Sequence, residues 1–206
     1  LGINSYKKTG NNENYFNSFS FFDHKLNLIK TYNKVNLVPF GEFLPLERIL
    51  RRIGLKSLTN NYQSFTSGEK RNIVSIDKNN FNIKILPLIC YEIIYSGQIF
   101  DNASFDYIIN ISEDGWFGDS IGPYQHFAHS IFRSIESGKY LIRSSNNGIT
   151  AIINPIGTVE KKIELGNSGY IDFDEIRVSD TTMFSQHGNK MFLIIILLYI
   201  FLILSF

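Results

Sequence analysis

Three residues with reactive side chains follow segments that are typical of strands: Lys34, Glu42 and Cys90, the only cysteine of the chain. Together they suit acyl transfer through a thioester. The cysteine attacks a carbonyl, a carboxylate moves protons, and the ammonium stabilises both the thiolate and the tetrahedral oxyanion. Plain packing of Cys90 stays open, because free cysteine is among the most buried residue types. A solvated Lys34–Glu42 pair also stays open.

Cys90 lies within the segment Ile83 to Ser96, I-K-I-L-P-L-I-C-Y-E-I-I-Y-S. The apolar run before the cysteine is rich in β-branched residues, which predicts a buried strand. Glu92 to Phe100 is predicted to begin a helix with a carboxylate in its first turn. A thiol at such a junction can meet a substrate beside backbone N–H donors.

Other segments predict how these residues are positioned. Leu1 to Ile3 is a strand stub followed by a polar loop, and Tyr15 to Lys34 is a hairpin. Tyr124 to Ser137 has helical periodicity and ends at Gly138. Tyr170 to Phe173 is a last short strand. Helices that interleave with strands favour a layered α/β sandwich.

The glycine-rich loop S-E-D-G-W-F-G-D-S-I-G-P contains Trp116 and Phe117. An aromatic pair flanked by glycines in a loop more often meets a ligand or membrane than a core, so both are candidate substrate-binding residues. His126 and His129 have a spacing that could hold a metal, but no third ligand of suitable spacing follows. We expect no metal and no cofactor, with His126 as a hydrogen-bonding residue.

The length of 206 residues suits one domain with a sizeable core. A net charge of +1 gives no reason to expect nucleic acid as a partner. A single cysteine excludes an intrachain disulfide framework.

The C-terminal run from Met191 to Phe206 is apolar and carries no charge. As a helix it would be about 24 Å long, against about 30 Å for the hydrocarbon core. This predicts a truncated transmembrane helix over residues 190–206, with a buried core helix as the alternative. Glu47 to Leu55 predicts a short helix, inside a basic amphipathic stretch that could rest on anionic lipid or cap the domain.

Several motifs stand in order along most of the chain. They are Y-N-K-V-N-L-V-P-F-G-E-F-L-P-L, I-C-Y-E, D-G-W-F-G, F-R-S-I-E-S-G and R-S-S-N-N-G-I-T. At these residues the chain resembles the nitrilase (carbon–nitrogen hydrolase) superfamily, and within it the apolipoprotein N-acyltransferases. The resemblance implies a four-layer αββα sandwich over residues 1–185, lacking its N-terminal part. It also implies a location on the periplasmic side of a bacterial inner membrane, carried by transmembrane helices.

The resemblance further implies an activity: transfer of a fatty acyl chain from a phospholipid to the N-terminal amine of a diacylated lipoprotein, by a monomer. Cys90 would be the nucleophile, and Lys34 with the backbone N–H of Tyr91 would stabilise the oxyanion. Glu42 matches the second glutamate beside the site. Glu92 would orient the turn that carries the nucleophile.

One residue of the family's site has no counterpart. The general base of the family is a glutamate on a strand that would precede Leu1, and Glu13 lies in the wrong place to replace it. The 206-residue chain by itself is therefore expected to be inactive, and its parent active. Two alternatives stay open: a membrane-tethered amidase that hydrolyses a carbon–nitrogen bond, and a non-catalytic binding module that keeps Cys90 for packing.

Overall fold

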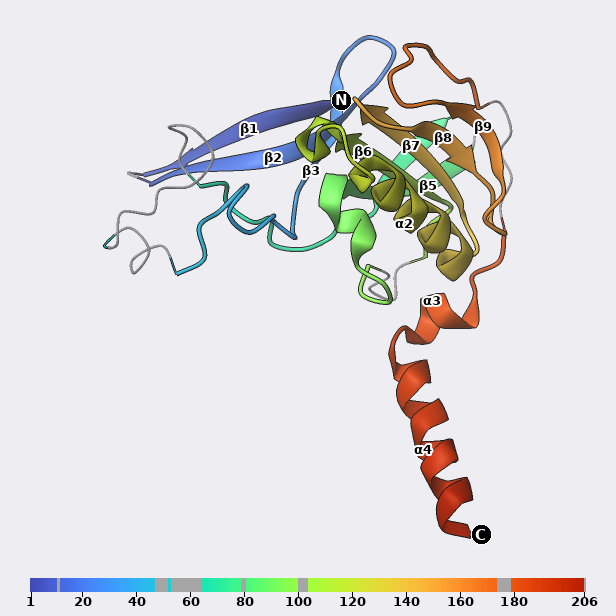
Figure 1. Cartoon of the computed structure of the whole chain (residues 1–206). Coiled ribbons are helices and arrows are strands. Elements are labelled where there is room, and N and C mark those ends of the chain that lie inside the picture. Colours follow the sequence, from blue (N-terminus) through green and yellow to red (C-terminus); the bar gives the residue numbers. More distant parts are fainter. Residues whose placement is uncertain are drawn as a thin grey trace.

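The computed structural model describes residues 1–10, 12–46, 52, 64–78, 81–99, 104–173 and 179–205. The helix predicted at Glu47 to Leu55 lies outside the described residues, apart from residue 52. The described strands form two sheets (Figure 1). A helix covers one face of the larger sheet, and the C-terminal residues form helices that lead away from it.

The smaller sheet is antiparallel and consists of β1 (Gly2–Thr9), β2 (Asn12–Phe22) and β3 (Leu28–Asn33). Strands β2 and β3 confirm the predicted hairpin. The predicted strand stub was too short, because β1 pairs with β2 from Gly2 to Thr9. The polar composition of β1 suggested a loop, but an exposed edge strand tolerates polar residues on both faces.

The larger sheet has the strand order β4-β5-β6-β7-β8-β9, and its three central strands β5, β6 and β7 are parallel. Its strands are β4 (Val74–Lys78), β5 (Phe81–Ile89), β6 (Tyr107–Glu113), β7 (Tyr140–Asn146), β8 (Thr150–Ile153) and β9 (Val159–Ile163). Since parallel strands end at the same edge, the residues that follow β5, β6 and β7 lie close together.

The strand predicted at Tyr170 to Phe173 does not form. The Phe173 ring instead lies 5.8 Å from the ring of Tyr107 and 5.3 Å from that of Tyr140, measured between centroids. Side-chain packing on the sheet, rather than ladder pairing, explains the apolar alternation in this segment.

The two sheets lie face to face, and helix α2 (Gly122–Ser137) covers the other face of the larger one. One apolar cluster joins the sheets, with Phe19, Phe21 and Tyr32 from the smaller sheet and Val74, Ile85 and Ile89 from the larger. Helix α2 ends at Gly138, whose φ of 67° is left-handed, as predicted. These layers confirm the α/β sandwich. They are three of the four expected, since no helix of the described residues covers the outer face of the smaller sheet.

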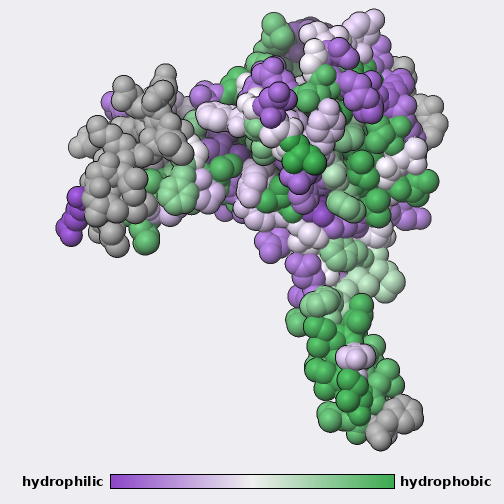
Figure 2. Space-filling model, in the orientation of Figure 1, coloured by the Kyte–Doolittle hydropathy of each residue, from purple (hydrophilic) through white to green (hydrophobic). Residues whose placement is uncertain are grey.

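The C-terminal segment leaves the sandwich through α3 (Met183–His187) and α4 (Lys190–Ser205). Helix α4 extends away from the body (Figure 2), and every residue from Phe192 to Leu204 is an exposed large hydrophobic. It measures about 24 Å, less than the roughly 30 Å of a bilayer core. No helix within the described ranges is long and apolar enough to cross a membrane, so the structure does not support the transmembrane helix predicted at 190–206.

Candidate active site

Cys90 lies at a sharp turn where β5 gives way to a one-turn 3-10 helix, η1 (Cys90–Ile94). The predicted helix beginning at Glu92 therefore begins two residues earlier and ends at Ile94. Cys90 is a half-buried free thiol with a φ of 49°. This left-handed conformation costs a residue with a Cβ about 1–2 kcal/mol, so the surrounding contacts must hold it in place.

The Glu92 carboxylate is fully buried and accepts four hydrogen bonds. Its Oε1 accepts from the Tyr32 hydroxyl at 2.7 Å and from the backbone N–H groups of Val35 and Asn36 at 3.0 and 3.1 Å. Its Oε2 accepts from the backbone N–H of Ile89 at 2.9 Å. Burial, together with the charge of Glu92, raises the pKa of Tyr32 well above its ordinary range, so the phenol remains a donor.

These bonds join the two strand ends that carry the candidate catalytic residues. Val35 directly follows Lys34 and Ile89 directly precedes Cys90, and one carboxylate binds the backbone of both. Val35 and Cys90 also pack against the same apolar cluster between the sheets. The contacts of Glu92 are those that the orienting role expected for it requires.

Lys34 and Glu42 form a buried ion pair rather than a solvated one. The Lys34 side chain is 1% exposed, and its Nζ lies 2.9 and 2.8 Å from Oε1 and Oε2 of Glu42. Glu42 also accepts from Nδ2 of Asn17 at 2.7 Å and from the backbone N–H of Val38 at 2.8 Å. The carboxylate is thus held by strand β2 through Asn17 and by the backbone of Val38, and it fixes the ammonium beside it.

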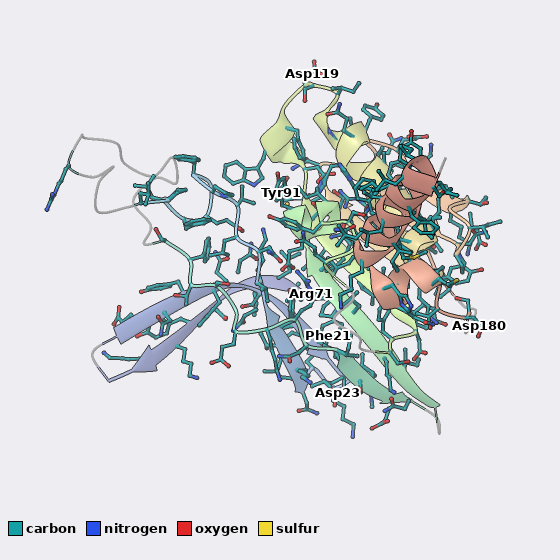
Figure 3. All side chains as sticks on the ribbon, turned by 90° about the horizontal axis from the view of Figure 1, so that it is seen from below. Phe21, Asp23, Arg71, Tyr91, Asp119 and Asp180 are labelled. Carbon is teal, nitrogen blue, oxygen red and sulfur yellow. The ribbon has the colours of Figure 1, made fainter. Side chains whose placement is uncertain are left out.

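Tyr91 follows the thiol, and the centroid of its ring lies 6.1 Å from that of Tyr95. Figure 3 labels Tyr91 and Arg71. The Arg71 guanidinium lies 3.7 Å from Oε1 of Glu92 and donates to the side chain of Asn36 and to the carbonyl of Gln98. Arg71 therefore ties the loop that follows Lys34 to the segment that follows η1.

A second buried polar group lies on the other side of the Cys90 turn, where β6 ends. Asp114 accepts from Nη2 of Arg143 at 2.7 Å and from the Ser112 hydroxyl at 2.7 Å. Its Oδ1 lies 2.9 Å from Nδ1 of His126, on α2. The other ring nitrogen of His126, Nε2, lies 3.2 Å from the carbonyl oxygen of Cys90.

The charges of this group hold Asp114 ionised. Burial by itself would raise the pKa of Asp114, but the His126 hydrogen bond, the Arg143 charge and the Ser112 hydroxyl together hold it well below its ordinary value. Burial lowers the pKa of Arg143, and the charge and hydrogen bond of Asp114 oppose that change.

The two aromatic residues of the glycine-rich loop have different environments. Trp116, in the short helix η2 (Gly115–Phe117), is 81% exposed. The ring of Phe117 lies 5.4 Å from the His126 ring and packs tightly over Gly122. Asp119, at the tip of the same loop, is marked in Figure 3. Trp116 is thus free to contact a substrate or lipid, while Phe117 contacts the buried histidine.

Asp114 and Arg143 were not identified from the sequence. Arg143 does leave a signal, because it interrupts the apolar strand segment L-I-R and a charge buried in a strand needs a partner. Its partner follows a different strand, so the pair could not be assigned without the fold. Within the part of the chain that the structure describes, no three His, Cys, Asp or Glu side chains converge as a metal site.

A cysteine at a turn that follows a buried strand, inside an α/β sandwich, is placed to act as a nucleophile in hydrolysis or group transfer. The carbon–nitrogen hydrolase family matches residues 1–181, and the chain belongs to this family. Its relatives include the apolipoprotein N-acyltransferase of Rickettsia prowazekii, 40% identical over 190 residues, or 91% of this chain and 37% of the relative. That of Rickettsia bellii is 39% identical over 204 residues, or 98% of this chain. The chain spans 40% of the length of that relative.

Solved structures show the same fold at low identity. A member of branch 10 of the nitrilase superfamily from Saccharomyces cerevisiae superposes with a TM-score of 0.57 at 16% identity, covering 82% of this chain and 56% of the other. An amidase from Nesterenkonia sp. superposes with a TM-score of 0.50 at 13% identity, covering 79% and 56%. These likenesses support the sandwich architecture and nothing about substrate.

Proposed function

We propose that the enzyme containing these residues transfers a fatty acyl chain from a phospholipid to the N-terminal amine of a diacylated lipoprotein. One observation carries the proposal. The buried Glu92 carboxylate accepts hydrogen bonds from the backbone N–H of Val35, next to Lys34, and from that of Ile89, next to Cys90. An ammonium and a thiol at neighbouring strand ends suit acyl transfer. The relatives named apolipoprotein N-acyltransferase supply the substrate class.

The reaction has two half-reactions. The Cys90 thiol gives its proton to a general base, which the resemblance assigns to a glutamate upstream of Leu1, and its sulfur attacks the ester carbonyl. The electron pair of the carbonyl moves to oxygen, where Lys34 and the Tyr91 N–H stabilise it. Collapse breaks the carbon–oxygen bond, and lysophospholipid leaves with the proton. The lipoprotein amine then attacks the thioester and releases the Cys90 thiol.

The proposed location is the bacterial inner membrane, with residues 1–185 as a monomeric catalytic domain on the periplasmic side. The exposed apolar helix α4 and the exposed Trp116 support contact with lipid. Residues 190–206 would lie in contact with the membrane. No nucleic acid, metal or cofactor takes part in the proposal.

The test uses the natural full-length gene product in detergent, incubated with a phospholipid of one defined acyl chain. Intact mass should show that acyl group on Cys90, removable by hydroxylamine, and a diacylated lipopeptide should then accept it at its N-terminus. Cys90→Ala should show neither step. Release of free fatty acid without transfer to the amine would indicate the amidase alternative. Normal function of Cys90→Ala would indicate a binding module.

A further inference from the structure

The contact between His126 and the backbone of the nucleophile has no part in the mechanism above. The His126 side chain is 3% exposed, and its Nε2 lies 3.2 Å from the carbonyl oxygen of Cys90. A carbonyl oxygen can only accept a hydrogen bond, so Nε2 carries the hydrogen. This conclusion holds whether Nδ1 donates to Asp114 or accepts from Arg143, which lies 3.1 Å away.

The bonded carbonyl belongs to the same peptide unit as the Tyr91 N–H. The structure has no cis peptide bond among the described residues, so this unit is planar and trans, with its C=O and N–H in opposite directions. A hydrogen bond that fixes the direction of the Cys90 carbonyl therefore also fixes the direction of the Tyr91 N–H. That N–H is the backbone donor expected at the oxyanion.

The conformation of Cys90 makes such a restraint necessary. A residue with a φ of 49° is strained and keeps this conformation only where neighbouring contacts hold it. Glu92 holds the Leu88–Ile89 peptide, one residue before the Cys90 peptide, through the N–H of Ile89, and His126 holds the Cys90–Tyr91 peptide through the Cys90 carbonyl. These two contacts restrain the backbone on both sides of Cys90.

The His126 ring is itself held on two sides. Asp114 lies 2.9 Å from Nδ1, and Arg143 holds that carboxylate through bonds to both of its oxygens. The ring of Phe117 lies against the imidazole. These contacts leave Nε2 directed at the Cys90 turn.

We infer that His126 is a positioning residue: by donating to the Cys90 carbonyl, it aims the Tyr91 N–H at the oxyanion that forms when Cys90 is acylated. The inference rests on the proposed function only in that Cys90 is acylated. The identity of the acyl donor and of the acceptor does not enter it.

The test compares two reactions of Cys90 in the full-length protein. Acylation by p-nitrophenyl butyrate forms a sulfur–carbon bond, passes through an oxyanion and releases p-nitrophenolate. Alkylation by iodoacetamide displaces iodide from carbon and forms no oxyanion. The ratio of the two rates therefore reports oxyanion stabilisation separately from the reactivity of the thiol.

Two substitutions separate the contacts of the ring. His126→Asn places an amide near the Nδ1 position, where it bonds Asp114 and loses the Cys90 carbonyl. His126→Gln places an amide N–H near the Nε2 position and keeps the bond to the carbonyl. Removing an oxyanion donor outright costs about 10²–10³-fold in rate, so a donor that is only misdirected should cost at least about tenfold. His129→Asn, on the same helix, is the matched control.

We expect His126→Asn to acylate at least about tenfold more slowly while its alkylation stays within about threefold of wild type. His126→Gln and His129→Asn should keep the wild-type ratio. The inference is overturned if the Asn variant keeps that ratio, or if the Asn and Gln variants lower it equally. If the Asn variant does not fold, the Gln variant decides, since a lowered ratio there also overturns the inference. A wild-type protein that reacts with the ester but not with phospholipid contradicts the proposed function alone.

Discussion

At the scale of single residues, the candidate site combines a strained cysteine with a buried ion pair. Cys90 has a left-handed backbone conformation, and the Lys34 ammonium is enclosed with the Glu42 carboxylate. Removing a charged pair from water is costly, and a fold retains such a pair where geometry or function needs it.

Lys34→Met should slow acylation of Cys90 in the full-length protein by about 10²–10³-fold, because the ammonium is expected to stabilise the oxyanion. The rate is measured as the appearance of the acyl-protein mass after mixing with phospholipid. Lys25→Met, on the exposed hairpin turn, should acylate at the wild-type rate. A Lys34→Met rate within threefold of wild type would falsify the role assigned to this ammonium.

Because of Asp114, the free energy of unfolding of the domain should decrease at acidic pH. Its pKa is depressed in the folded state, so its stabilising contribution is complete above its ordinary pKa, about 3.9, and is lost as the pH falls below that value. The difference in thermal midpoint between wild type and Asp114→Asn should be constant from pH 5 to 7 and shrink toward pH 3, values that bracket the ordinary pKa. Asp119→Asn, in the exposed loop, should show no such difference; a gap that widens in acid contradicts the assignment.

At the scale of elements, the site depends on where the three parallel strands end. The C-terminal ends of β5 and β6 lead directly into the turn of Cys90 and into Asp114, and Arg143 lies within β7. Helix α2 adds His126 from the covering layer. Groups carried by strands of one sheet are placed more precisely than groups carried by loops, and the buried hydrogen bonds around them hold their orientation.

At Gly148 the backbone lies so close to the Asp114 carboxylate that there is no room for a side chain. A Cβ at this position would lie 2.3 Å from Oδ2 of Asp114 and 2.3 Å from Oγ of Ser145, far inside van der Waals contact. Gly148→Ala should displace the carboxylate and lower both the thermal midpoint and the rate of Cys90 acylation. Gly169→Ala, whose Cβ would meet only the end of the Ile163 side chain, should behave as wild type. Equal thermal midpoints for the two variants would contradict this prediction, because the Asp114 carboxylate would then shift without cost.

At the scale of the whole molecule, the described residues form three layers of a sandwich and an apolar helix that leaves it (Figures 1 and 2). The chain spans 37% of the Rickettsia prowazekii relative. An exposed helix of this composition is unfavourable in water and is expected to be covered by lipid or detergent.

The isolated 206-residue chain should transfer no acyl group, because the resemblance assigns the general base to a glutamate upstream of Leu1. Without that base, Cys90 should still be alkylated by iodoacetamide if the sandwich folds. The measurement is acyl transfer to a diacylated lipopeptide by the chain and by the full-length gene product, side by side. Transfer by the chain alone would place the base within residues 1–206.

The sequence by itself determined the buried strand before Cys90, the helix that ends at Gly138 and the hairpin after Tyr15, because periodicity and glycine placement are local signals. Motifs also predicted Lys34, Glu42 and Glu92 as site residues, and their roles stay predictions. Only the tertiary structure decided that Glu92 binds both strand ends, that Asp114 pairs with Arg143, and that His126 reaches the Cys90 carbonyl. Buried hydrogen bonds join residues that lie far apart in the chain, and their partners depend on strand order and on which face each side chain occupies.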